Sequence, residues 1–405
     1  MEKPKERVGN EHEKLGVGAY ISLILIILFF SGIMGSLNNW LSFFDFTTLS
    51  GKFGLIGAGK GAANFQGAGG DGAKQGFMFA FSLVPVVMLA MGSVAVAESF
   101  GAVKAAQRLL TPLLKLLLGI PGEAGLALIT SLQSTDASAS MTKALKDDGT
   151  ITEDETTVFC TWQFSSDGII TNFLGTGAAL WALVDANGNP AIRISMMIPF
   201  VLQLILKFFG ANIVRFYLKA KKGSNKAVMQ DVTEGADSSV SMVSSEKNYN
   251  ATAQTIENPK VNPTTTFVSG CNRGLNIGFK SIIPNVLMAF VIIKALNVSG
   301  IMNIIGAALA PIMGIFGLPG QASAVLLASF ISMGGGVGAA GELFAEGILT
   351  GSQVAILSPA MFLMGALLQN SGRLLQVVQV EHKPLLFMVC ILNAMLSMFI
   401  MNIFI

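Results

Sequence analysis

The chain has 405 residues, of which 52% are hydrophobic and 12% charged, with a net charge of +2 and a mean hydropathy of +0.63. A soluble domain carries about 25% charged residues, so this composition excludes a soluble globular protein and indicates an integral membrane protein. The small net charge argues against nucleic acid as a partner. Three dispersed cysteines and two histidines make neither a disulfide framework nor a metal-binding cluster.

The first part of the chain predicts one extra helix followed by a membrane unit. Residues 1–16 are polar, and residues 17–75 contain an apolar stretch near Val17–Trp40 and a loop rich in Gly and Ala. That stretch is too long for the core of a signal peptide and lacks a small-residue cleavage site, so we expect an uncleaved membrane helix. Residues 76–221 predict, in order, a span at Gln75–Ala97, an interfacial segment at Gly101–Leu118, a broken segment at 119–145, a membrane segment with polar interruptions at Thr156–Val184, and a span at Ile192–Lys219.

The second part predicts a matching unit after a polar linker. Residues 222–265 are rich in Ser, Asn, Thr and Lys, a composition typical of a flexible linker. Residues 266–405 then predict a span at Ile282–Leu296, an apolar segment at Ile301–Phe316, a broken segment at 319–345, a span at 352–380 with polar residues inside it, and a last span at Pro384–Ile405.

An internal repeat relates the two units. The first broken segment begins with Gly119-Ile-Pro-Gly and the second with Gly317-Leu-Pro-Gly, 198 residues later. The same spacing relates Ser131 to Ser329, Gly149 to Gly347, Thr152 to Thr350, and Asn172 to Asn370. A repeat of this length predicts two structurally similar copies.

Each broken segment predicts a helix that is interrupted at membrane depth. About ten apolar residues follow the Pro-Gly pair, whereas ~20 are needed to cross a bilayer core of ~30 Å. The hydroxyl residues or glycines that come next are tolerated in a membrane only where they are buried in protein or line a cavity. Interrupted apolar segments at matching places in two halves point to the binding site of a secondary transporter.

The positive charges predict the orientation. Lys and Arg concentrate in residues 1–14 and in the linker, so we expect both to be cytoplasmic. The first copy then begins outside and ends inside, and the second begins inside. The expected fold is an all-α integral membrane protein with two inverted-topology repeats, re-entrant helical hairpins and one extra N-terminal helix.

Asp136 is the ionisable residue in the polar stretch of the first broken segment. An ionisable group at membrane depth is costly and commonly marks a substrate or ion pathway, so Asp136 is a candidate for binding substrate, H⁺ or Na⁺. The alternative is an N-cap, since Ser, Thr and Asp are all preferred there. At the matching place in the second copy, Gly334, Gly335 and Gly336 either expose backbone amides to a ligand or allow close helix packing.

A second polar group follows in each copy. Asn172 and Asn370 occupy the same repeat position, and two such residues favour a site over simple helix-packing hydrogen bonds. Arg373 is the only basic residue between Ala295 and Val380. It either clamps a substrate carboxylate or phosphate, or forms an ion pair with Glu342 or Asp167.

The candidate substrate- and ion-binding residues are therefore Gln133, Ser134, Thr135, Asp136, Ser138, Gln163, Ser166, Asp167 and Asn172 in the first copy, and Ser332, Gly334, Gly335, Gly336, Glu342, Gln369, Asn370, Ser371 and Arg373 in the second. The membrane part contains no Ser/His/Asp set, no paired-carboxylate motif and no zinc motif. We therefore expect no enzyme activity, no catalytic residue, no metal and no cofactor beyond H⁺ or Na⁺ as a coupling ion.

The paired Pro-Gly segments, with Leu132-Gln-Ser-Thr-Asp-Ala-Ser in one copy and Ser332-Met-Gly-Gly-Gly-Val-Gly in the other, resemble the nucleoside-recognition (Gate) domain membrane proteins. The resemblance covers about residues 76–405 and is strongest to a YjiH/YjiG-like branch in a fused form. It implies a transport fold in a bacterial inner membrane. It also implies either a nucleoside-like substrate or, because that branch is associated with isoaspartyl-dipeptide breakdown, a small amino-acid or peptide substrate.

Together these features predict a multi-pass secondary active transporter of a small polar solute, with its site at the midplane between the two broken segments. Its partners would be the substrate and the lipid bilayer, and a homo-oligomer is compatible with the sequence. The alternative is a non-transporting membrane scaffold, as in the related spore-maturation proteins.

Overall fold

The structure is a computed structural model that describes residues 15–36, 41, 44–50, 72–185, 188–229 and 262–405. These residues are nearly all helical, and their extended pairing is a single β-bridge between Val184 and Pro190. Five helical stretches are long and apolar enough to cross a membrane: Gly72–Ser99, Met197–Lys221, Pro263–Asn297, Gly351–Gln376 and Lys383–Phe404. The chain is therefore a multi-pass helical membrane protein, as its composition predicted.

The extra N-terminal helix is shorter than the sequence indicated. Helix α1 (Val17–Ser31) ends because Gly32 adopts the left-handed conformation with φ of +74°. Two short helices follow, α2 (Ile33–Ser36) and α3 (Phe46–Ser50). The helix expected near Val17–Trp40 is thus interrupted at Gly32 and resumes over Ile33–Ser36, while Leu37–Trp40 lie outside the described residues.

The first copy follows the predicted order of elements. It comprises α4 (Gly72–Ser99), α5 (Ala102–Leu113), η2 (Leu114–Leu118), η3 (Gly122–Ala124), α6 (Gly125–Ser131), α7 (Thr135–Asp147), α8 (Glu153–Phe164), η4 (Ile170–Gly175), η5 (Thr176–Ala182) and α9 (Met197–Met229). The predicted broken segment is interrupted between α6 and α7, and the next membrane segment is interrupted at residues 165–168, after α8.

The second copy has the same two interruptions. It comprises α10 (Pro263–Ile277), η6 (Gly278–Ile282), α11 (Ile283–Val298), α12 (Ile301–Gly314), η7 (Gly320–Ala322), α13 (Ser323–Ile331), α14 (Met333–Ala345), α15 (Gly351–Leu363), α16 (Leu367–Asn370), η8 (Ser371–Gln376) and α17 (Lys383–Phe404). The span expected at Ile282–Leu296 is part of a longer helical stretch, because α10, η6 and α11 run on without a break from Pro263.

The first pair of interruptions, between α6 and α7 and between α13 and α14, is here called the serine breaks. Ser134 and Ser332 adopt extended backbone conformations and are the N-caps of α7 and α14. Each serine hydroxyl accepts a hydrogen bond of 3.4 Å from the backbone N–H three residues later. A serine that satisfies a free N–H group is what a helix start requires.

The second pair, at residues 165–168 and 364–366, is called the span breaks. Gly168 and Ala366 both adopt positive φ, +52° and +54°. Gly168 N–H donates to Ser131 O over 3.1 Å, and Ala366 N–H donates to Ser329 O over 2.7 Å. The two donors are 198 residues apart, and so are the two acceptors. The repeat seen in the sequence therefore extends to individual backbone hydrogen bonds.

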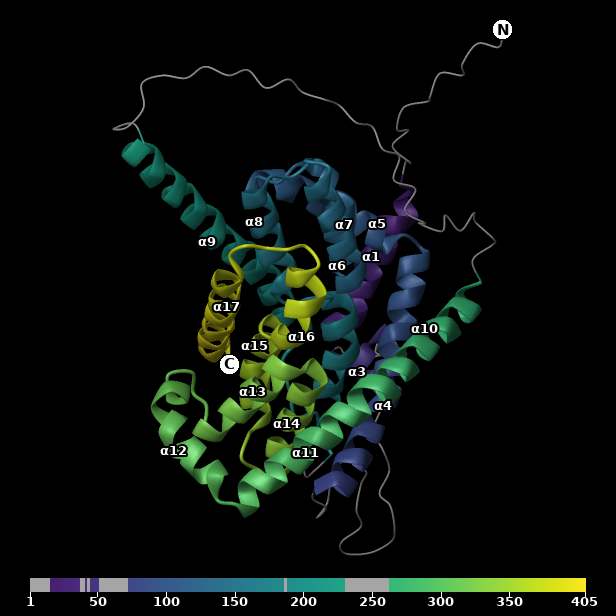
Figure 1. The fold of residues 1–405 in the computed structure, drawn as a ribbon. Coiled ribbons are helices and arrows are strands. Elements are labelled where there is room, and N and C mark those ends of the chain that lie inside the picture. The colour runs from purple at the N-terminus through teal and green to yellow at the C-terminus, as the bar shows by residue number, and fades with distance from the viewer. Residues whose placement is uncertain (1–14, 37–40, 42–43, 51–71, 186–187, 230–261) are drawn as a thin grey trace, which may run out of the picture.

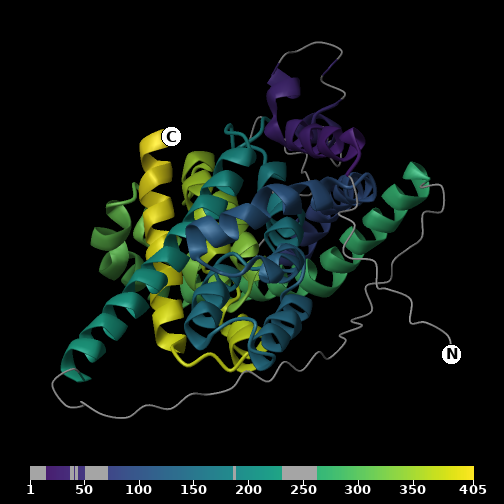
Figure 2. The same ribbon diagram turned by 90° about the horizontal axis from the view of Figure 1, so that it is seen from above.

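Close packing between the copies brings their breaks together. Helix α4 lies along the continuous α10–α11 stretch, which crosses the front of the molecule in Figure 1. The contact is tight because a Cβ at Gly270 or Gly274 would meet the α4 backbone within 3 Å. Helices α7 and α8 lie at the top of Figure 1 and α12 at the bottom, and Figure 2 shows α17 beside α9.

Candidate functional site

A small polar cavity lies where the two copies meet. It has a volume of about 120 Å³ and is lined by residues of both span breaks and of the second serine break. The first copy contributes Asp167, Asn172 and Thr176, and the second contributes Ser281, Asn285, Ser332, Met333, Gly334, Ala366, Gln369, Asn370 and Arg373. Seven of these twelve residues are among the candidates from the sequence, so the structure brings distant candidates together in one place.

Asp167 is the acidic side chain of this cavity, and it is only 3% exposed. The left-handed conformations of Ser166 and Gly168 on either side turn the chain sharply at this residue. Thr135, in the first turn of α7, donates its hydroxyl to Asp167 Oδ2. Asn172 donates its side-chain amide to Asp167 O over 2.7 Å. Asp167 Oδ1 is buried and accepts no hydrogen bond from the described chain.

Asn370 is the most informative residue of the cavity. Its side chain is 1% exposed, and neither Oδ1 nor Nδ2 has a hydrogen-bond partner in the described residues. Leaving a buried polar group unpaired costs about 1–3 kcal/mol, so such groups are rare and need an explanation. A ligand in the cavity would supply both a donor and an acceptor for this amide.

Arg373 and Asp136 form a two-point ion pair between the copies. Arg373 Nε donates to Asp136 Oδ1 over 2.7 Å, and Nη2 donates to Asp136 Oδ2. The side chains are 48% and 62% exposed, and Arg373 also lines the cavity. The sequence suggested Glu342 or Asp167 as the ion-pair partner, and the structure instead gives Asp136. The N-cap alternative for Asp136 is also wrong, because Ser134 caps α7.

The three glycines have different surroundings. Gly334 lines the cavity, next to Asn285. Gly336 packs against Ser329 of α13, where a Cβ would lie 2.9 Å from the Ser329 Cβ. Gly335 donates its N–H to Ser332 and has no neighbour closer than 3.4 Å to an added Cβ. Close packing thus explains Gly336, while exposure of backbone to a ligand remains a proposal for Gly334.

Several candidate residues lie outside the cavity lining, and most of these have structural partners. Gln133 donates to Glu98, which also forms an ion pair with Arg273. Gln163 and Thr142 exchange hydrogen bonds of 2.9 and 3.2 Å that join α7 to α8. The remaining residues outside it are Ser134, Thr135, Asp136, Ser138, Ser166, Gly335, Gly336, Glu342 and Ser371.

Five cavity residues and one buried lysine were not among the residues predicted from the sequence. The five are Thr176, Ser281, Asn285, Met333 and Ala366. The lysine is Lys207 in α9, which is 1% exposed and contacts the first span break. A signal was present, because Lys207 is the only charged residue between Arg193 and Arg215 in an apolar span.

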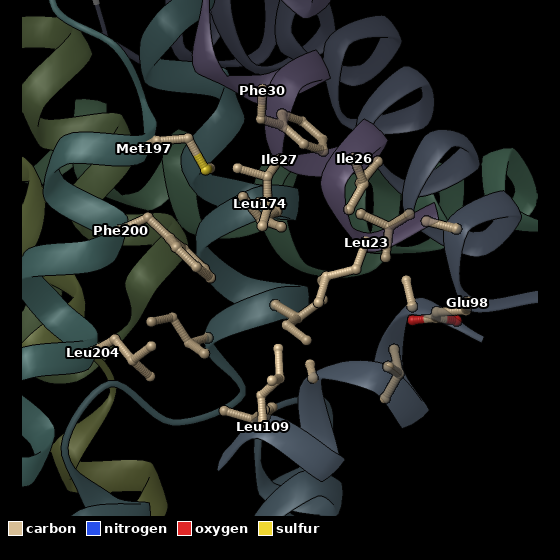
Figure 3. A pocket seen from close by; sticks show the side chains of 18 residues that line it. Leu23, Ile26, Ile27, Phe30, Glu98, Leu109, Leu174, Met197, Phe200 and Leu204 are labelled. Carbon is tan, nitrogen blue, oxygen red and sulfur yellow. The ribbon is translucent and has the colours of Figure 1, made fainter. Parts of the chain in front are cut away.

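Two larger cavities are apolar and flank α1. One, of about 320 Å³, is lined by α1, α4, α5, α9 and η4, and Figure 3 shows Leu23, Phe30, Leu109 and Phe200 around it. The other, of about 400 Å³, lies between α1 and α4. Glu98 is the only charged side chain in either described lining. These cavities lack the convergent polar groups that orient a polar solute, so the small polar cavity is the better candidate.

The described residues contain no group of three His, Cys, Asp or Glu side chains that could hold a metal ion.

The chain is similar to several known proteins. Residues 80–212 and 279–379, more than half of the chain, match the Gate family, described as nucleoside recognition.

Two relatives come from Escherichia coli K12. The chain is 44% identical to YjiH over 214 residues, covering 53% of this chain and 91% of YjiH. It is 46% identical over 138 residues to YjiG, called an inner membrane protein, covering 34% of this chain and 90% of YjiG. An outward-facing structure of CNTnw is similar in fold, with a TM-score of 0.50 and 14% identity, over 96% of this chain and 90% of that one.

Proposed function

The chain belongs to the Gate family of nucleoside-recognition membrane proteins, and on this premise we propose that it is a secondary active transporter of a small polar solute. The solute binds in the polar cavity between the copies, and its movement is coupled to H⁺ or Na⁺. Family membership and a fold shared with CNTnw both favour transport over catalysis. The similarity to YjiG favours an inner-membrane location.

Asn370 is the observation that carries this proposal. It presents one unpaired donor and one unpaired acceptor in a buried polar cavity, beside the unpaired Oδ1 of Asp167. A protein that bound nothing here would lose about 1–3 kcal/mol for each unpaired group without compensation. A scaffold protein, the second candidate function, gives no reason for such a cost.

The chemistry of the cavity narrows the class of solute. Asn370 is complementary to a group that carries a donor and an acceptor side by side, such as an amide or the lactam edge of a nucleobase. Asp167 Oδ1 would accept from an amine or hydroxyl group of the same solute. Nucleosides, amino-acid amides and dipeptides all carry such groups.

The size of the cavity favours the smaller members of this class. Pockets for drug-sized ligands measure about 300–1,000 Å³, whereas this cavity measures about 120 Å³. An amino acid or an amide of similar size is therefore the preferred solute in this conformation, and a nucleoside would require the two copies to move apart.

The repeat supports alternating access as the mechanism. Both copies place a serine break and a span break at the same repeat positions. If the copies have opposite topology, one can rock against the other around a fixed midplane site. The Asp136–Arg373 pair joins the copies and would have to open or exchange partners as the cavity opens on that side.

A binding screen tests the proposal. We would measure the melting temperature of purified wild-type protein with nucleosides, amino acids, amino-acid amides, dipeptides and dicarboxylates, and repeat each stabilising condition with Asn370→Ala. A ligand that binds the native state raises the melting temperature. We expect at least one amide-bearing solute to stabilise the wild type and not the variant. Equal stabilisation of both proteins by every active compound would reject this cavity as the site.

A further inference from the structure

Lys207 is a buried cation that lies outside the lining of the polar cavity. It lies in the middle of the α9 span, at 1% exposure. Its ammonium group donates to the backbone carbonyls of Ser165 and Ser166, over 2.8 Å in the second case. The same nitrogen lies 4.4 Å from the ring centroid of Trp162. Each of its described partners is therefore electron-rich.

The partners of Lys207 arise from the first span break. Helix α8 ends at Phe164, so the carbonyls that follow cannot be paired within a continuing helix. The carbonyl end of a helix also carries a partial negative charge. In transporters with interrupted helices, carbonyl groups of this kind coordinate Na⁺. The aromatic face of Trp162 adds a further site of attraction for a cation.

Helix α9 holds this break at two points. Ser166, whose φ is +50°, donates its hydroxyl to Gln203 Oε1 over 2.7 Å, one turn before Lys207. Gln203 in turn donates to Pro199 O over 3.1 Å. The next residue after Ser166 is Asp167 of the cavity, so the position of the cavity carboxylate depends on the contacts of α9.

We propose that Lys207 is a tethered cation that fills a monovalent-cation position at the first span break, so that this position needs no free Na⁺. This inference rests on the proposed function, because the first span break contributes Asp167 to the proposed substrate site. The cation position itself is formed by the two carbonyls and Trp162, and the carboxylate of Asp167 is a further negative charge that interacts with Lys207. Removing the amine should create a site for a small free cation, because the carbonyls and the ring would remain.

The test uses full-length protein and needs no substrate. Melting temperatures of wild type and Lys207→Ala are compared as NaCl replaces choline chloride at constant ionic strength. Choline is a quaternary ammonium whose charged nitrogen carries no N–H group, and it is far larger than Na⁺. Lys219→Ala is the matched control, because Lys219 is an exposed lysine near the end of the same span.

We expect Lys207→Ala to melt at a lower temperature than wild type in choline and to recover part of the loss as Na⁺ is added, with the melting temperature rising with the logarithm of the Na⁺ concentration. Wild type and Lys219→Ala should show no such recovery. If Lys207→Ala cannot be purified, Lys207→Gln provides the same comparison, since a neutral amide also leaves the position without a charge.

An Na⁺ response of equal size in wild type and in the variant would overturn the proposal, and so would a variant that is destabilised but insensitive to Na⁺. The second result would mean that Lys207 only ties α9 to the break. Neither result would affect the proposed transport function, which is tested separately by solute binding in the cavity and by Asn370→Ala.

Discussion

Asp136 and Arg373 are 237 residues apart in the chain and form a two-point ion pair across the two copies. Asp136 lies in the first turn of α7, where the positive end of the helix favours a carboxylate. Its neighbour Thr135 holds Asp167 of the cavity. The first turn of α7 thus contacts the span break of its own copy through Thr135 and the Arg373 of the other copy through Asp136. These contacts link the cavity to the relative position of the two copies.

The guanidinium of Arg373 is expected to be needed for its geometry as well as its charge. Arg373→Lys retains the positive charge and loses the planar fork. The variant should fold normally, because exposed ion pairs contribute only about 0.2–1 kcal/mol. Its affinity for the transported solute should fall at least ~tenfold, equivalent to ~1.4 kcal/mol. Titration of the solute measures this effect, and unchanged affinity together with a destabilised Arg373→Ala would mean that the arginine only stabilises the fold.

The carboxylate of Asp136 is expected to matter for transport more than for folding. Asp136→Asn keeps the size and polarity of the side chain and removes the ion pair with Arg373. We expect concentrative uptake to be abolished while the melting temperature changes little. Asp147→Asn is the control, since Asp147 pairs with Lys143 near the exposed end of the same helix. Uptake at the wild-type level in Asp136→Asn would show that the pair is dispensable.

Removing the unpaired amide of Asn370 should impair binding without a loss of stability. Asn370→Ala deletes two groups that have no partner in the described residues, so the free energy of unfolding should be nearly unchanged. Solute affinity should fall at least ~tenfold, as expected for a lost pair of hydrogen bonds. Gln163→Ala is the opposite case, because Gln163 is buried and bonded to Thr142. It should lower the melting temperature and leave affinity unchanged, and the reverse pattern in the two variants would contradict this assignment of roles.

Two adjacent glycines of α14 should respond differently to the same substitution. Gly336→Ala would place a Cβ 3.0 Å from the Ser329 Cα, and overpacking of this kind costs about 1–3 kcal/mol. Gly335→Ala meets Ala328 O at 3.4 Å, and replacing a helical glycine by alanine gains about 0.5–1 kcal/mol. Melting temperatures of the two variants in detergent should therefore move in opposite directions. A lower melting temperature in both variants would mean that α14 has no space for a methyl group at either position.

The opposite topology of the two copies can be tested at equivalent turns. Asp147 and Ala345 are exposed, occupy the same repeat position and precede the α7–α8 and α14–α15 turns. Single cysteines at these positions, in a background without Cys160, Cys271 and Cys390, should react with a membrane-impermeant reagent from opposite faces. Reaction of both from one face would exclude inverted repeats. The loop charges predict that Ser244 in the linker and Ala63 in the Gly- and Ala-rich loop also lie on opposite faces, and both residues are outside the described residues.

The sequence by itself determined the class of the protein, its repeat and the places where helices are interrupted. Composition indicates a membrane protein because apolar residues must face lipid over a fixed thickness. Breaks at Ser134 and Ser332 are predictable because capping and glycine conformations are local properties, set by residues within one turn. The family resemblance rested on the same local motifs, and the match over more than half of the chain confirms it.

The tertiary structure decided which polar residues share the cavity and which have structural partners. Asn370 and Gln163 look alike in the sequence, as amide side chains in apolar segments, yet Asn370 has no described partner while Gln163 is paired with Thr142. Packing of one copy against the other brings Asp136 to Arg373, and packing within the first copy brings α9 to the first span break. The physical reason is that the partner of a buried polar group is set by the distance and direction between helices that are far apart in the chain, and no local pattern contains this information.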